Sequence, residues 1–228
     1  MNNKSQIQQD LILDQHFFKN KTNGFFVEVG ALDGFGASNT YFFEKERNWS
    51  GLLIEPNPIE FNKRHQYPIV GCTESHIKAI QYAKEKGFEE VIIFEDDVVV
   101  NKNIKNFTYE NLPSNWDMLY LGGILTRSMY KDKQWVRGII WCNHAYVVKK
   151  HMYDIILNEF SKMDIESMRL NKQCIDWFYT EHINPKYNCF LAEEQYIVQK
   201  EDFSDIDQKV KWTNNFNWDT YTMKNLNF

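Results

Sequence analysis

The sequence predicts an α/β fold, a Rossmann-like mixed sheet flanked by helices. The continuous apolar run at 91–94 is typical of a strand covered on both faces, and residues 25–29 and 52–55 form two more strand-like runs. Before the strand at 91–94, residues 72–86 carry apolar side chains at helical spacing, and Gly87 follows as a helix stop. Strands that alternate with helices in this way build a sheet with helices on its faces.

The strand at 91–94 runs directly into three carboxylates, Glu95, Asp96 and Asp97. In open α/β sheets, ligands bind beyond the carboxyl ends of the strands. Three adjacent carboxylates repel one another unless a positive charge compensates, and a divalent cation does so with hard oxygen ligands. The alternative for an isolated Glu-Asp-Asp sequence is a solvated acidic turn.

The N-terminal part of the chain also carries a ligand-binding pattern. The strand at 25–29 breaks into a turn that contains Gly30 and Gly34, and the strand at 52–54 ends at Glu55. A strand, glycine turn, helix and acid-ended strand form the nucleoside-binding half of a Rossmann-like domain. Glycine lets the backbone approach a ligand closely, and the acid accepts hydrogen bonds from ribose hydroxyls.

Several motifs surround the acidic strand in a fixed order. Gly-Cys at 71–72 and Ser-His at 75–76 open the helix before it, and more motifs follow at 116–122, 145–148, 175–176 and 199–206. Together they resemble glycosyltransferase family 25 over residues 67–210, a family that includes lipooligosaccharide and collagen galactosyltransferases. The strand and helix that usually open this family, and help to hold the nucleotide base, have no counterpart after residue 67.

This resemblance implies a GT-A type fold in which Glu95, Asp96 and Asp97 hold Mn²⁺ or Mg²⁺ against the diphosphate of a nucleotide sugar. A metal there neutralises charge on the departing nucleoside diphosphate. The resemblance also implies that Asp176 lies near the acceptor, where it is our candidate for the general base. Asp117, at the start of a predicted strand, is a second catalytic candidate, and a capping or turn carboxylate is the alternative.

Other polar residues near the predicted site have two interpretations each. We expect His76 to face the sheet edge beside the acidic strand, although a lone histidine is often a hydrogen-bonded structural residue. Asn143 and His144 interrupt the apolar run at 139–148. They either line the predicted binding pocket or are a polar pair that the strand tolerates. Residues 124–137 carry four basic side chains amid few apolar positions, namely Arg127, Lys131, Lys133 and Arg137. This composition predicts an exposed loop, which either closes over a diphosphate or is simply solvated.

The first part of the chain resembles a different enzyme. Motifs at 24–31, 33–34, 38–40, 49–51 and 54–58 together resemble the start of an FkbM-type methyltransferase over residues 5–65. By this resemblance Glu55 would hold the ribose of S-adenosylmethionine (SAM), in a site formed by Glu28, Gly30, Asp33, Gly34, Glu55 and Asn57. The Lys-x-Asp-x-Glu-Gly strand of that family has no counterpart later in the chain.

The two resemblances divide the chain into an incomplete methyltransferase-like segment, 1–66, and a family 25-like domain, 67–228. With 228 residues the chain is short for two complete enzymes. No Gly/Ser-rich linker or charge block marks the seam between residues 61 and 71. We therefore expect one mixed sheet that contains the strands of both parts.

Three functions fit these observations. The first is metal-assisted transfer of a sugar, galactose or glucose, from a UDP-sugar to a hydroxyl of a glycan or protein acceptor. The second is methyl transfer from SAM through the N-terminal segment. The third is an inactive fusion that acts as a binding protein.

Composition narrows the setting. A net charge of −5 and a pI near 5.7 do not favour a nucleic-acid partner. Because no apolar run approaches a membrane span and the N-terminus lacks a signal-peptide core, we expect a soluble, intracellular protein of the cytoplasm. The four cysteines form no Cys-x-x-Cys pair, so they suggest neither zinc nor a disulfide scaffold. Heavy use of Asn, Lys and Ile fits an AT-rich genome, such as a viral one.

Overall fold

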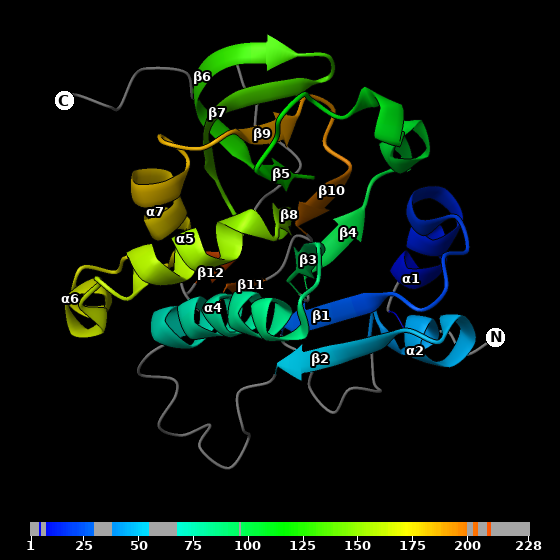
Figure 1. The fold of residues 1–228 in the computed structure, drawn as a ribbon, viewed down its shortest axis with the longest axis horizontal. Coiled ribbons are helices and arrows are strands. Elements are labelled where there is room, and N and C mark those ends of the chain that lie inside the picture. The colour runs from blue at the N-terminus through cyan, green and yellow to red at the C-terminus, as the bar shows by residue number, and fades with distance from the viewer. Residues whose placement is uncertain are drawn as a thin grey trace.

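The computed structural model describes residues 5, 8–29, 38–54, 68–95, 97–199, 203–204 and 209–210. Within these residues an eight-stranded mixed sheet has the strand order β2-β1-β3-β8-β5-β9-β7-β6 (Figure 1). The strands in chain order are β1 (Phe25–Val29), β2 (Ser50–Ile54), β3 (Glu90–Phe94), β5 (Met118–Tyr120), β6 (Ile124–Asp132), β7 (Trp135–Trp141), β8 (Ala145–Lys149) and β9 (Cys189–Ala192).

The two strands of the N-terminal segment belong to the same sheet as the rest of the chain. β1 pairs in parallel with β2 on one side and with β3 on the other, and Glu28 lies in register with Phe94. The antiparallel strand β8 joins β3 to β5. β3 and β5 therefore run in the same direction, and their carboxyl ends lie at one edge of the sheet.

Helices cover one face of this sheet with a large apolar core. The long helix α4 (Pro68–Lys86) packs beside α5 (His151–Phe160), and both contact the sheet (Figure 1). Ile77, Ile80 and Ala83 recur at helical spacing, and all three are buried against strand side chains such as Ile93. Shorter helical segments complete this layer: α6 (Ile165–Leu170), α7 (Ile175–Phe178) and the π-helix η5 (Tyr179–Ile183).

The other face is covered by N-terminal and connecting segments around a second apolar cluster, rich in aromatic side chains. Phe17, Trp49, Phe107 and Trp116 are all buried there. The segments are α1 (Gln9–Ile12), the π-helix η1 (Leu13–Phe18), α2 (Tyr41–Arg47), and the 3-10 helices η3 (Lys102–Asn106) and η4 (Tyr109–Asn111).

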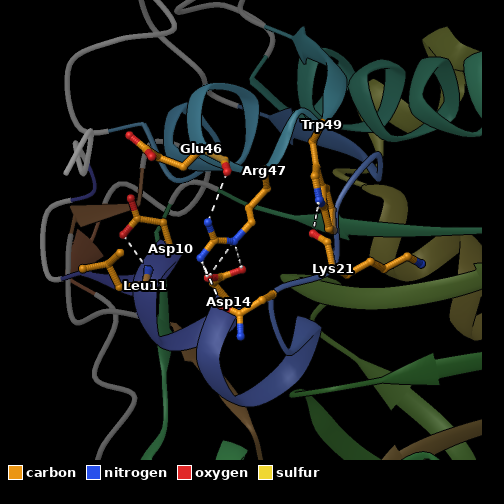
Figure 2. A network of polar contacts seen from close by, with 8 residues as sticks. Asp10, Leu11, Asp14, Lys21, Glu46, Arg47 and Trp49 are labelled. Atoms are coloured by element: carbon orange, nitrogen blue, oxygen red, sulfur yellow. Dashed lines mark hydrogen bonds and ion pairs between the residues drawn. The ribbon is translucent and has the colours of Figure 1, made fainter.

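A polar network attaches η1 to α2 within that layer (Figure 2). Arg47 donates through Nε to both carboxylate oxygens of Asp14, at 2.9 and 3.0 Å, and Nη2 forms an ion pair with the same group. The Trp49 indole N–H donates to the backbone carbonyl of Lys21 at 2.7 Å. The Asp14 side chain is only 3% exposed, so its charge depends on Arg47 for compensation.

Two separate two-stranded sheets accompany the main sheet. β4 (Val98–Val100) pairs antiparallel with β10 (Ile197–Gln199), and β11 (Phe203–Ser204) pairs with β12 (Lys209–Val210). Among the described residues, no helix is long and apolar enough to cross a membrane.

The prediction of an exposed loop over 124–137 is wrong. These residues form the β6 strand and the start of β7, an antiparallel hairpin with two register shifts. β6 is an edge strand with mostly exposed side chains, so its sequence is polar although its backbone is paired. Trp135 and Ile140 of β7 are buried, and the basic side chain of Arg137 is buried beside them.

Candidate functional site

The acidic motif lies where β3 leaves the sheet. The backbone N–H of Glu95 donates to the carbonyl of His144 at 2.9 Å, one residue beyond the paired strand. The chain then turns into β4, with Asp97 immediately before it. Glu95 and Asp97 are both half-buried at this edge, and Asp96 lies outside the described residues.

One amide group holds the two described carboxylates together. Nε2 of Gln199 donates to Oε2 of Glu95 at 3.1 Å and to Oδ2 of Asp97 at 3.3 Å. Gln199 is 8% exposed and is delivered by β10, in register with Val98 of β4. This residue was not among the predicted site residues, although it opens the last of the sequence motifs. The carboxylates therefore converge on one point, as a shared cation site requires.

His76 contacts the same acidic residue from helix α4. Its Nε2 lies 3.4 Å from Oε1 of Glu95, which confirms the predicted position beside the acidic strand. Its Nδ1 lies 2.8 Å from the Tyr146 hydroxyl, which is 3.3 Å from that of Tyr179. Burial raises the pKa of both tyrosines well above the ordinary value, so both hydroxyls stay protonated at neutral pH.

Asp176 reaches the same edge of the sheet from α7. Its Oδ1 accepts a hydrogen bond from the backbone N–H of Asn143 at 3.1 Å. Asn143 precedes His144, whose carbonyl accepts from Glu95, so two consecutive residues connect Asp176 to the acidic motif. The side chain of Asn143 is 1% exposed, and neither of its amide atoms has a hydrogen-bond partner within the described structure.

Asp117 lies at the opposite ends of the parallel strands from the acidic motif. It precedes β5, which runs parallel to β3, so it lies at the amino end of its strand while Glu95 lies at a carboxyl end. Its carboxylate accepts from the Asn188 backbone N–H at 2.7 Å and contacts Nε2 of His151 at 2.8 Å. The structure does not bring Asp117 together with the acidic motif, and these contacts match the turn-carboxylate alternative.

Glu28 lies beside the acidic strand, but its carboxylate organises the chain before α2. It accepts hydrogen bonds from Ser38 Oγ at 2.8 Å, from the Asn39 backbone N–H at 2.7 Å and from Thr40 Oγ1 at 2.5 Å. A cavity of about 20 Å³ has both Glu28 and Glu95 in its lining. The rest of the predicted SAM site lies outside the described residues: Gly30, Asp33, Gly34, Glu55 and Asn57.

A larger cavity, of about 360 Å³, lies away from these carboxylates. Its lining includes Gly24, Ser50 and Glu90, which lie at the amino ends of β1, β2 and β3. The acidic motif lies at the carboxyl ends of the same parallel strands. Glu95 and Asp97 therefore do not line this cavity.

Comparison with solved structures finds matches at low sequence identity. The chain matches a nucleoside-diphosphate-sugar pyrophosphorylase from Vibrio cholerae RC9 with a TM-score of 0.46 and 12% identity, over 82% of this chain and 80% of that one. It matches a glycosyltransferase involved in glycosylation of the major capsid of PBCV-1 with a TM-score of 0.43 and 12% identity, over 81% and 96%.

A third structure is the CTP:phosphocholine cytidylyltransferase from Streptococcus pneumoniae, with a TM-score of 0.43 and 13% identity over 87% of this chain and 80% of that one. No curated protein matches the chain.

The family model described as glycosyltransferase family 25 (LPS biosynthesis protein) matches residues 67–222. This match spans more than half of the chain and includes α4, the acidic motif, Asp176 and Gln199. The chain belongs to glycosyltransferase family 25.

Proposed function

We propose that this protein transfers a hexose, galactose or glucose, from a UDP-sugar to a hydroxyl group of a glycan or protein acceptor, with help from a divalent cation. The observation that carries the proposal is the convergence of Glu95 and Asp97 on one amide of Gln199 at the carboxyl edge of β3. Asp176 reaches the same edge from another element. Family membership supports glycosyl transfer as the reaction.

The donor set fits Mn²⁺ or Mg²⁺. Glu95 and Asp97 offer carboxylate oxygens, the hard ligands that these ions take. We assign the ion mainly to Asp97 with Asp96, because Glu95 also contacts His76. A bound cation would neutralise charge on the nucleoside diphosphate as it leaves. The amide of Gln199 holds Glu95 and Asp97 at a common point before any ion arrives.

Asp176 is the proposed general base. The backbone N–H of Asn143 fixes the orientation of its carboxylate through Oδ1. In an inverting transfer, the acceptor oxygen attacks the anomeric carbon and gives its proton to this carboxylate, while the bond from that carbon to the diphosphate oxygen breaks. The carboxylate then releases the proton to solvent. Asp176 therefore affects turnover more than donor binding.

Ligand titrations monitored by thermal unfolding test this proposal. UDP-galactose or UDP-glucose with Mn²⁺ should stabilise the protein by about 2.7 kcal/mol at a hundredfold excess over the dissociation constant. We expect Asp97→Asn to abolish this response, and Asp176→Asn to keep it while losing sugar transfer. Asp117→Asn is the matched control, since its carboxylate lies at the opposite edge and should affect neither readout.

A parallel titration with SAM separates the alternatives. Stabilisation by SAM alone, without any response to the UDP-sugars, would replace the proposal with methyl transfer. A protein that responds to neither ligand would be the inactive fusion. Since the Glu28 carboxylate already accepts three hydrogen bonds inside the fold, we expect no SAM response.

A further inference from the structure

Cys72, His76 and Glu95 form a cluster of metal-ligating side chains on the inner side of the acidic motif. One ligand atom from each lies within 4.8 Å of those of the other two. Cys72 and His76 are four residues apart on α4, so their side chains lie on the same face of the helix, one turn apart. Glu95 approaches from the end of β3, against which α4 packs.

The buried ring of His76 directs one nitrogen toward the carboxylate of Glu95. The ring is fully buried, and its Nε2 has no hydrogen-bond partner among the described residues. When Nδ1–H donates to the Tyr146 hydroxyl 2.8 Å away, the lone pair of Nε2 faces Oε1 of Glu95 at 3.4 Å. Two electron-pair donors that face each other at this distance are stabilised by a positive charge between them, which either a proton on Nε2 or a metal ion supplies. Metal-binding histidines ordinarily donate their other ring N–H to an oxygen in this way.

The spacing fits a tetrahedral ion. Zinc bonds of about 2.0–2.1 Å to nitrogen and oxygen place two such ligands about 3.3 Å apart at a tetrahedral angle. The observed distance from Nε2 of His76 to Oε1 of Glu95 is 3.4 Å. With a zinc–sulfur bond of about 2.3 Å, Cys72 Sγ would have to close by at most about 1.2 Å, which a side-chain rotation supplies.

We propose that Cys72, His76 and Glu95 bind a Zn²⁺ ion, in addition to the hard cation assigned to the Asp97 side. A thiolate and an imidazole select zinc over Mg²⁺ or Mn²⁺. Glu95 uses Oε1 toward this site and Oε2 toward Gln199, so its two oxygens serve different sides. The zinc ion clamps α4 to the end of β3, and its fourth position takes a water molecule. This site does not depend on the proposed sugar transfer.

Cobalt substitution in the full chain tests the site directly. After EDTA treatment and dialysis, one equivalent of Co²⁺ should produce a thiolate-to-cobalt charge-transfer band, and Zn²⁺ should abolish it while excess Mg²⁺ should not. We expect Cys72→Ser to lose the band. Cys174→Ser is the matched control, because it removes another half-buried thiol and should keep the band. A missing band in the unmodified protein, or one that persists in Cys72→Ser, overturns the proposal.

Tyr146→Phe tests the inferred histidine geometry. Because this change removes the oxygen that accepts from Nδ1–H, we expect zinc affinity to fall about 10–100-fold. An unchanged affinity would contradict the assigned ring orientation. His76→Gln should lose the band, with far-ultraviolet circular dichroism as a folding check, and Cys72→Ser decides the outcome if that variant does not fold. The UDP-sugar titration with Mn²⁺ is a separate readout, so either proposal can fail while the other stands.

Discussion

At the scale of single residues, Gly122 shows how closely the backbone packs around the acidic edge. A Cβ atom at this position would lie 1.8 Å from the Ile197 carbonyl oxygen and 2.5 Å from Nε2 of His144. The carbonyl of the preceding residue, Leu121, accepts from the backbone N–H groups of Tyr196 and Ile197. Glycine is therefore needed here for close approach, because β10 lies directly against the end of β5.

We expect Gly122→Ala to destabilise the protein by about 3 kcal/mol or more, because the methyl group must displace the backbone of β10. The same displacement moves Gln199 away from Glu95, so binding of UDP-sugar with Mn²⁺ should weaken as well. Urea unfolding and the ligand titration measure the two effects.

Gly71→Ala is the matched control for that change. Gly71 lies within α4, and a Cβ there would meet nothing within 4 Å outside its own helical turn in the part of the chain that the structure describes. Alanine at such a position should stabilise the helix by about 0.5–1 kcal/mol. If both alanine variants lowered stability equally, the close contact of Gly122 would not be the cause.

At the scale of elements, the ion pair between Arg47 and Asp14 attaches η1 to α2 beside the edge-to-face contact of Phe18 with Phe43. The Arg47 guanidinium donates to both oxygens of Asp14, and this hydrogen bonding raises the pKa of Arg47. The planar guanidinium matches a carboxylate in a way that a lysine ammonium does not. Loss of Arg47 would leave the carboxylate of Asp14 buried without compensation.

We expect Arg47→Ala to cost about 3 kcal/mol in urea unfolding, and Arg47→Lys to recover only part of that loss. Lys45→Ala is the control in the same helix, because Lys45 and Glu44 form an exposed pair whose removal should change stability by less than about 1 kcal/mol. Equal losses of unfolding free energy in the two alanine variants would show that the contact with Asp14 contributes no more than an exposed ion pair.

The elements also show what the sequence could and could not predict. The runs at 25–29 and 91–94 became strands, and 72–86 lies within a helix, because local apolar patterns encode these elements. The β6–β7 hairpin was missed because an exposed edge strand has the polar composition of a loop.

The same limit applies to the candidate site. The location of Glu95 and Asp97 could be predicted because they directly follow an apolar strand. The location of His76 could be predicted because it lies in the helix that precedes this strand. Gln199 is 104 residues from Glu95, and only the β4–β10 pairing brings it there. Asp117 lies far from the motif because it precedes the amino end of β5, whereas Glu95 follows the carboxyl end of the parallel strand β3. The relative direction of these two strands depends on the arrangement of the sheet and not on local sequence.

At the scale of the whole molecule, burial of titratable side chains sets the response to high pH. Burial raises the pKa of Tyr120, Tyr146, Tyr179 and Cys189 above their ordinary values. In the unfolded chain these groups lose their protons at about pH 8.5 for cysteine and about pH 10 for tyrosine. Above those values the folded protein binds more protons than the unfolded chain, so stability falls as pH rises.

Urea unfolding at about pH 8, 9, 10 and 11 measures this effect. We expect stability to fall above about pH 8, by up to about 1.4 kcal/mol per pH unit for each group that is deprotonated in the unfolded chain and still protonated in the folded protein. Tyr120→Phe should make the decline above pH 10 less steep. A free energy of unfolding that does not change up to pH 11 would contradict the burial of these groups.

The pairing of Gln199 with Glu95 and Asp97 also orders events during synthesis. A ribosome adds about 5–20 residues per second, so the 104 residues that separate Glu95 from Gln199 take about 5–20 s to make. During that interval the nascent chain carries adjacent carboxylates without the amide that bridges them. Water solvates these carboxylates until β10 emerges, so the contacts with Gln199 are among the last to form as the chain is made.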